Sequence, residues 1–157
     1  MGTKHHRLSR EYYKGRVCAS FTLCLERRTS FFTTTAIVRV FVGFLEKVAV
    51  KHDFKAIYYC FMPDHAHLIS LGSSVNTDLL RAVQQFKQYS GFWLAVTHPV
   101  VRWQKSFYDR IIRADELHTQ IAYVLDNPVR WGLVDDWRKY PFTGAVGLDL
   151  EEFLQNL

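Results

Sequence analysis

The chain has 157 residues, of which 48% are hydrophobic and 15% aromatic, enough apolar material for the core of one ordinary domain spanning residues 1–157. Its net charge of +5 suits an anionic partner without identifying one. The cysteines form no CxxC pair and the N-terminus lacks the apolar core of a signal sequence, so we expect a reduced, cytoplasmic protein. The most apolar stretch is broken by Arg39, Glu46 and Lys47 before it reaches the roughly 20 apolar residues that a membrane span requires, so we expect no membrane association.

Alternating apolar residues and strand-forming side chains predict a first strand over residues 17–25. Residues 54–62 and 65–72 form two further strand-like runs, and the Pro63-Asp64 pair between them predicts a tight hairpin. A fourth strand is expected over residues 106–113.

Helical periodicity predicts three helices between these strands. The first is capped by residues 33–35 and ends near His52, and the second opens at Asn76 or Thr77 with Phe92 among its inward residues. The third begins at about Asp115. This order predicts an α+β, ferredoxin-like sandwich with a central antiparallel sheet flanked by helices, a basic segment at about 1–16 and a short C-terminal tail at about 143–157.

The stretch FMPDHAHLIS, residues 61–70, contains the first candidate site residues. Because side chains alternate along a strand, His65 and His67 project from one face about 7 Å apart, and Ala66 and Leu68 from the other. Two imidazole nitrogens so placed can converge on one cation. An HxH pair alone is more often two hydrogen-bonded polar residues on a half-exposed strand, so a third ligand is needed.

A zinc site would need that ligand from cysteine or histidine, and the cysteines have no zinc-type spacing. Mg²⁺ or Mn²⁺ would accept a side-chain oxygen and keep open positions for a substrate phosphate. In the third predicted helix, Tyr123 and Asn127 are four residues apart and therefore share a face. Taken singly, Asn127 before Pro128 also fits a helix cap, and Tyr123 also fits ordinary packing at a helix edge.

Together these side chains form an arrangement with a clear chemical use. The Asn127 amide oxygen and the imidazoles of His65 and His67 can hold a divalent cation that polarises a phosphodiester. The Tyr123 phenol can then attack phosphorus. The product would be a phosphotyrosine link to DNA and a free 3′ hydroxyl.

The same elements resemble the HUH single-strand transposases and nucleases, and most closely the REP-associated tyrosine transposases. The matching stretches are FMPDHAHLIS, WQKSFYDRIIR, YVLDNPVRWGLV and WRKYPF, which occur in the family's order over residues 12–142. The HxH pair alone is a weak match, but joined to the Tyr-x-x-x-Asn-Pro element it is specific.

The resemblance implies the HUH endonuclease fold, His65 and His67 as paired ligands of Mg²⁺ or Mn²⁺, Asn127 as the third ligand and Tyr123 as the nucleophile. It also implies a hairpin-forming, single-stranded DNA substrate built from palindromic repeats. Two departures are the small Ala66, where the family name implies a bulky hydrophobic residue, and Asn127, where insertion-sequence relatives carry glutamine.

Single-stranded DNA is held by cations along its backbone and by aromatic rings under its bases. The basic residues near the proposed site and in the N-terminal segment are the candidate contacts, whereas many of the neighbouring rings are expected in the core. These candidates are Arg102, Lys105, Arg110, Arg113, Arg130, Lys14, Arg16 and Lys87.

Two other functions stay open. A host-adopted relative would bind structured single-stranded DNA with little catalysis, and a zinc hydrolase would use a metal-bound water. Against the hydrolase count the absent third histidine or cysteine and the lack of a general-base carboxylate beside the HxH pair. The sequence leaves monomer and homodimer undecided.

Overall fold

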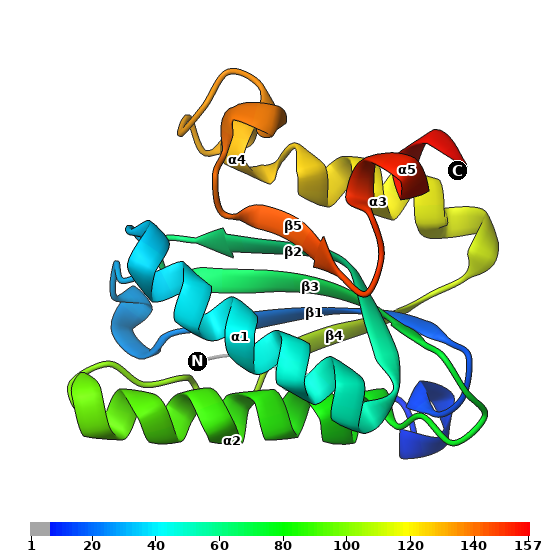
Figure 1. The fold of residues 1–157 in the computed structure, drawn as a ribbon, viewed down its shortest axis with the longest axis horizontal. Coiled ribbons are helices and arrows are strands. Elements are labelled where there is room, and N and C mark those ends of the chain that lie inside the picture. The colour runs from blue at the N-terminus through cyan, green and yellow to red at the C-terminus, as the bar shows by residue number, and fades with distance from the viewer. Residues whose placement is uncertain (1–6) are drawn as a thin grey trace.

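A computed structural model of the chain describes residues 7–157, and its centre is a sheet of five strands in the order β4-β1-β3-β2-β5 (Figure 1). Every pair of neighbouring strands is antiparallel. The strands are β1 (Cys18–Cys24), β2 (Phe54–Met62), β3 (His65–Gly72), β4 (Tyr108–Ile112) and β5 (Thr143–Val146). The predicted α+β antiparallel fold is confirmed.

Two long helices begin at side-chain caps that the sequence supplies. The Thr34 hydroxyl accepts a hydrogen bond from the backbone N–H of Ile37 at 3.3 Å, and the Asp78 carboxylate accepts one from Arg81 at 3.1 Å. The helices are α1 (Thr35–His52), α2 (Leu79–Thr97), α3 (Leu117–Leu125), α4 (Asn127–Arg130) and α5 (Leu150–Gln155). None of the described helices is long and apolar enough to cross a membrane.

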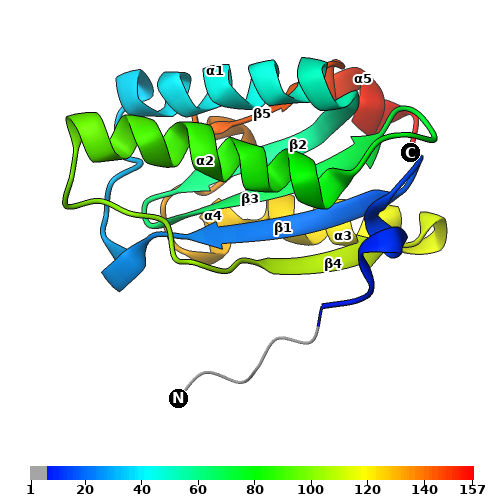
Figure 2. The ribbon, with the colours of Figure 1, turned by 90° about the horizontal axis from the view of Figure 1, so that it is seen from below.

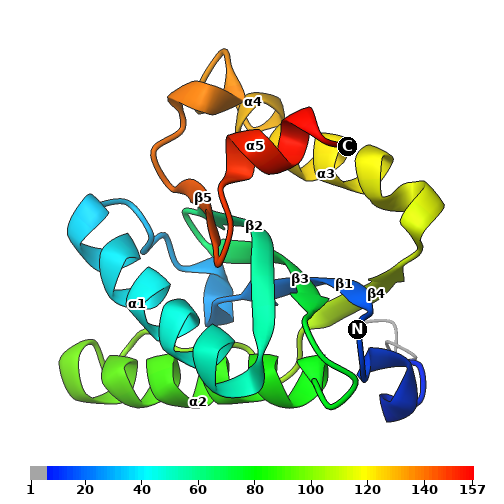
Figure 3. The same cartoon turned by 45° about the vertical axis from the view of Figure 1, so that its right-hand side comes forward.

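The helices cover the two faces of the sheet separately. Figures 1 and 2 show α1 and α2 side by side on one face, and Figure 3 shows α3, α4 and α5 on the other. Each face has its own apolar cluster, with Phe21 and Leu68 in the α1–α2 layer and Cys60 and Ile69 in the α3–α5 layer. Because strand residues alternate between these layers, His65 and His67 lie on the α3–α5 side, as Ile69 does.

Three details differ from the sequence-based expectations, and the first is the start of α2, which is capped by Asp78 rather than by the expected Asn76 or Thr77. Phe92, expected to point inward, is 74% exposed, because the inward position on that turn of α2 is taken by Ser90. The Ser90 hydroxyl accepts a hydrogen bond from Trp103 Nε1 at 2.9 Å and donates to the Phe86 carbonyl at 2.6 Å. Residues 143–157, expected as a tail, contain β5 and α5.

The basic N-terminal segment is described only in part, since residues 1–6 lie outside the described range. A 3-10 turn over Arg10–Tyr13 buries Tyr13, whose hydroxyl donates to the Asp109 carboxylate on β4 at 2.6 Å. This contact fixes the segment to the edge of the sheet.

Candidate functional site

The histidine pair lies at the start of the central strand β3, directly after the Pro63-Asp64 turn. The strand register places His65 between Cys24 of β1 and Met62 of β2, and His67 between Thr22 of β1 and Cys60 of β2. Ladders on both sides therefore fix the backbone that carries the pair.

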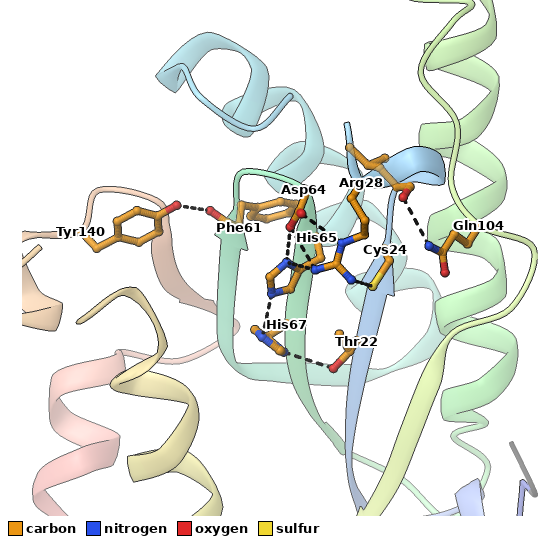
Figure 4. A network of polar contacts seen from close by, with 10 residues as sticks. Thr22, Cys24, Arg28, Phe61, Asp64, His65, His67, Gln104 and Tyr140 are labelled. Carbon is orange, nitrogen blue, oxygen red and sulfur yellow. Dashed lines mark hydrogen bonds and ion pairs between the residues drawn. The ribbon is translucent and has the colours of Figure 1, made fainter. Parts of the chain in front are cut away.

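The two imidazoles face each other through their Nε2 atoms, which lie 3.2 Å apart, with ring centroids at 4.8 Å (Figure 4). Their outer nitrogens have separate partners. His65 Nδ1 is 2.6 Å from the Asp64 carboxylate, and His67 Nδ1 is 3.1 Å from the Thr22 hydroxyl. Two nitrogens bound to one cation at about 2.1 Å also lie about 3 Å apart, so the spacing fits a shared ion.

Both imidazoles are held in the neutral form that binds metals. The pKa of His67 is lowered to about 3, chiefly by burial, and nearby His65, Arg130 and Arg28 act in the same direction. Burial also lowers the pKa of His65, which outweighs the opposite effect of the Asp64 carboxylate. Each ring therefore carries one N–H at physiological pH and keeps a lone pair on its other nitrogen.

The Asp64 side chain links His65 to a cation on a neighbouring loop. Arg28 donates to both carboxylate oxygens of Asp64, at 3.0 and 3.3 Å, and its third nitrogen lies 3.4 Å from Cys24 Sγ. Burial opposes ionisation of Asp64, but the hydrogen bonds from Arg28 and His65 outweigh it and hold the pKa of this carboxyl below its usual value. An ionised carboxylate only accepts hydrogen bonds, so His65 carries its proton on Nδ1 and leaves Nε2 free.

Tyr123 and Asn127 lie side by side at the junction of α3 and α4, joined by Arg130. The Arg130 guanidinium donates to the Tyr123 carbonyl at 2.7 Å and to Asn127 Oδ1 at 3.1 Å, and it lies 4.0 Å from the centroid of the Tyr123 ring. Tyr123 is 62% exposed, whereas Asn127 is buried. The phenol is therefore open to a large substrate while the amide is fixed.

The turn after Asn127 approaches the histidine pair. The Trp131 ring centroid is 5.5 Å from that of His65, and the charge of Arg130 acts on His67. Trp131 is 52% exposed, so its ring borders both His65 and solvent. Arg130 and Trp131, at the end of α4, are thus the residues of this segment that lie beside the histidine pair, although they are far from it in the chain.

The donor set at this place fits a divalent cation only if a residue other than His, Cys, Asp or Glu completes it. Within residues 7–157, no cluster of three such side chains could hold a metal. Among these residues, the buried Asn127 Nδ2 has no hydrogen-bond partner, and Asn127 Oδ1 has a second lone pair beyond the one used by Arg130. Two neutral imidazoles and an amide oxygen are donors that can bind a divalent cation.

Three of the candidate DNA-binding cations gather beside α2. Lys87, Arg102 and Lys105 line a groove of about 430 Å³ together with Trp103. The Lys87 ammonium donates to the carbonyls of Gln104 and Lys105 at 2.7 and 3.1 Å, and burial lowers its pKa. Lys87 therefore connects α2 to the backbone of residues 104–105 on the other side of this groove, while Arg102 and Lys105 are exposed.

The remaining candidates lie elsewhere on the surface. Arg110 and Arg113, at the β4 edge, both contact the Glu116 carboxylate, at 2.6 and 3.4 Å. Lys14 and Arg16 are exposed at the opposite end of β1 from the histidine pair, and Arg16 donates to the Ser73 carbonyl at 3.3 Å. The predicted cations thus form separate groups, and only Arg130 lies within the site itself.

Sequence reasoning missed Thr22, Arg28 and Asp64 as members of the site. Asp64 directly precedes His65, so its position was the one available signal, but it was assigned to the turn alone. Thr22 and Arg28 are brought to the histidines by strand pairing and by a loop contact that no local pattern reveals.

Comparison with known proteins gives a family and a fold. The family model for IS200-like transposases matches residues 15–127. No curated protein sequence matches the chain. Among solved structures, a REP-associated tyrosine transposase bound to a REP hairpin superposes with a TM-score of 0.74 at 21% identity, over 90% of this chain and 82% of that one. A candidate transposase from Deinococcus radiodurans R1 superposes with a TM-score of 0.54 at 14% identity, over 81% of this chain and 97% of that one.

The two structural likenesses support the fold, and the family match covers most of the chain, from before β1 to Asn127. The prediction of a transposase with the fold of the REP-associated relatives is confirmed. The chain belongs to the family of IS200-like transposases.

Proposed function

We propose that the protein nicks single-stranded DNA and joins the resulting ends, using Tyr123 as the nucleophile and a Mg²⁺ or Mn²⁺ ion held by His65, His67 and Asn127. The observation that carries this proposal is the pair of Nε2 atoms facing each other at 3.2 Å. Neither atom has a carboxylate or carbonyl partner in the described chain, and Trp131, in the turn after Asn127, lies beside His65.

The residues of the chain divide the work in a simple way. The Tyr123 oxygen forms a bond to phosphorus as its proton leaves, and the bond from phosphorus to the 3′ oxygen breaks, so that a 3′ hydroxyl is released. The 5′ phosphate stays on Tyr123 as a phosphodiester. Attack by another 3′ hydroxyl reverses the exchange, returns the phenol and joins the strands.

When bound, the divalent ion supplies a positive charge that withdraws electron density from the phosphoryl oxygens. Arg130 contacts both Tyr123 and Asn127 and fixes their relative positions, which lowers the entropic cost of reaching the reactive geometry. Asp64 and Thr22 hold the outer nitrogens of the histidines and so aim the inner ones.

A DNA hairpin is the proposed substrate. The similar structure with a TM-score of 0.74 was solved with a REP hairpin, and the surface of this chain carries several groups of exposed cations. The candidate phosphate contacts are Arg102, Lys105, Arg110, Arg113, Arg130, Lys14 and Arg16, with Lys87 supporting the first two. Because affinity is spread over many contacts, binding should survive the loss of any one catalytic residue.

Incubation with a labelled hairpin oligonucleotide and Mn²⁺, followed by denaturing electrophoresis, tests the proposal. We expect a covalent protein–DNA adduct in the wild-type protein and none in Tyr123→Phe, because the variant lacks the attacking oxygen. His65→Ala should also form no adduct while keeping its affinity for the hairpin.

Two other exposed tyrosines provide matched controls. Tyr108 pairs with Thr22 in the row of residues that contains His67, and Tyr12 lies in the N-terminal turn. Both Tyr108→Phe and Tyr12→Phe should form the adduct. Tyr123 would be excluded as the nucleophile if Tyr123→Phe formed the adduct, or if only Tyr108→Phe lost it. If the wild-type protein bound the hairpin but formed no adduct, a DNA-binding protein with little catalysis would be favoured.

A further inference from the structure

We infer that Arg28 is a positioning residue for the candidate metal site: it fixes the Asp64 carboxylate against Nδ1 of His65, so that the Nε2 lone pair of His65 points at His67. This inference rests on the proposed function for its purpose. Its structural basis is a set of contacts that the proposed chemistry does not itself require.

The loop that carries Arg28 has an unusual backbone. Arg27 and Arg28 follow β1 in a 3-10 turn over Glu26–Arg28, and their φ angles are +59° and +49°. Side chains other than glycine seldom adopt this left-handed region, and such residues gather at functional sites. Two in succession turn the chain sharply and bring the Arg28 side chain back over the end of β1.

The Arg28 guanidinium meets three side chains at that point (Figure 4). Its Nε and Nη2 donate to the two oxygens of Asp64 at 3.0 and 3.3 Å, in a two-pronged arrangement that fixes the carboxylate in orientation as well as position. Its Nη1 lies 3.4 Å from Cys24 Sγ. Nη2 also comes within 3.4 Å of His65 Nδ1, where both nitrogens share the same carboxylate oxygen as acceptor.

Attachment of the loop to the hairpin does not depend on this side chain. Backbone N–H groups of Leu25, Phe31 and Phe32 donate to the carbonyls of Asp64 and Pro63 at distances of 2.8 to 3.0 Å. The Arg28 side chain is also 47% exposed, so it contributes little to the core. Its contacts therefore act on the orientation of Asp64 rather than on the fold.

Arg27 offers a matched control. It lies next to Arg28 in the same left-handed region, it is exposed, and among residues 7–157 it has no hydrogen bond or ion pair. Arg27→Ala and Arg28→Ala thus remove the same charge and impose the same backbone change. They differ in the contacts that Arg28 makes with Asp64, Cys24 and His65.

The first test uses the metal-free protein with ¹⁵N-labelled histidine. We expect the ¹⁵N shifts of His65 to show a protonated Nδ1 and a bare Nε2 in wild type and in Arg27→Ala. In Arg28→Ala, the tautomer protonated on Nε2 should gain population, and Arg28→Lys should restore part of the wild-type ratio. An unchanged His65 tautomer in Arg28→Ala overturns the inference.

The second test measures Mn²⁺ affinity by calorimetry without DNA. Loss of a partner that orients a metal-binding histidine typically weakens binding by about 10- to 100-fold, so we expect about tenfold weaker binding in Arg28→Ala and none of this loss in Arg27→Ala. If Arg28 acts through Asp64, adding Arg28→Ala to Asp64→Ala should cause no further loss. Equal, additive losses would mean that Arg28 acts on its own and would overturn the inference.

Failure of the proposed function looks different. Here the wild-type protein would bind no Mn²⁺ or form no adduct, while its His65 tautomer still depended on Arg28. Either result would exclude the metal-dependent chemistry, but the role of Arg28 in positioning Asp64 would stand.

Discussion

At the scale of single residues, Arg130 is the side chain that unites the candidate site. One guanidinium contacts the backbone and ring of Tyr123 and the amide oxygen of Asn127, and its charge reaches His67. This cation can neutralise the charge of a phosphate that enters the site. The residue following it, Trp131, then offers an exposed aromatic face directly beside His65.

Trp131 is in position to stack with a nucleobase next to the reacting phosphate. Stacking on an aromatic side chain contributes about 1–3 kcal/mol per base, so we expect Trp131→Ala to weaken hairpin binding about 5- to 100-fold at fixed salt. Fluorescence anisotropy with a labelled hairpin measures the change.

Phe92→Ala is the control for this experiment, because Phe92 is also exposed but lies on α2, on the other face of the sheet. It should bind like wild type. Equal affinities of wild type and Trp131→Ala would remove Trp131 from the interface.

The sequence predicted His65 and His67 because a strand period of two puts both on one face within a single short motif. It also predicted that Tyr123 and Asn127 would share a face, and the Arg130 contacts bear this out. Arg28 could not be predicted, because its position depends on two left-handed residues and on a hairpin 36 residues further along the chain. The roles of these residues in catalysis stay predictions.

At the scale of elements, Glu116 lies in the turn from which α3 starts, and its carboxylate balances the charges of Arg110 and Arg113. Its carboxylate accepts a hydrogen bond from the Arg113 backbone at 3.0 Å, which closes a capping box at the 3-10 turn Ala114–Glu116 directly before α3, and it also pairs with the Arg110 side chain. The helix that carries Tyr123 thus begins at a residue that holds two of the candidate DNA-binding arginines.

Replacing Glu116 by glutamine separates these two effects. Glutamine keeps an oxygen for the capping box, but it lacks the charge that holds Arg110 and Arg113. We therefore expect Glu116→Gln to bind the hairpin more tightly. We also expect the plot of log affinity against log salt concentration to steepen by about 0.7 for each phosphate newly contacted.

Glu151→Gln removes the same charge from α5, away from these arginines, and should change affinity far less. A similar gain in both variants would show that net charge alone is responsible.

The longer elements were predictable and the short ones were not. β2, β3, α1 and α2 have clear periodicity, and the Thr34 cap of α1 lies within the predicted residues 33–35, whereas α2 is capped by Asp78 rather than by the predicted Asn76 or Thr77. β5 has only four residues and α5 only six, so neither is long enough to show a period. Phe92 was misplaced because apolar character alone was read as burial, whereas Ser90 occupies the inward position through its hydrogen bond with Trp103.

At the scale of the whole molecule, tyrosine hydroxyls and cysteine thiols are buried in the apolar clusters on both faces of the sheet. Burial raises the pKa values of Tyr13, Cys18 and Cys60 to about 12, with a hydrogen bond to Asp109 adding to the effect for Tyr13. In the unfolded chain these groups lose their protons near 10.0 for tyrosine and 9.0 for cysteine. The unfolded state therefore binds fewer protons than the folded state above these values, and stability must fall as pH rises.

Each such group lowers the free energy of unfolding by about 1.4 kcal/mol per pH unit between its unfolded and folded pKa values, so three together give about 4 kcal/mol per unit from about pH 10 to about pH 12. Urea unfolding under reducing conditions across this range measures the slope. Tyr13→Phe should be less stable at neutral pH but lose stability less steeply at alkaline pH. A urea midpoint that does not change between about pH 8 and about pH 11 would contradict the raised pKa values of these three side chains.

The central position of β3 has a dynamic consequence. Exposing the amides of a strand flanked on both sides requires two ladders to separate, whereas a short helix lying on the surface can detach alone. We therefore expect the backbone amides of β3, which carries His65 and His67, to exchange with solvent more slowly than those of α3, which carries Tyr123. The candidate site therefore combines histidines on the central strand of the sheet with a tyrosine on a short helix that covers one face of it.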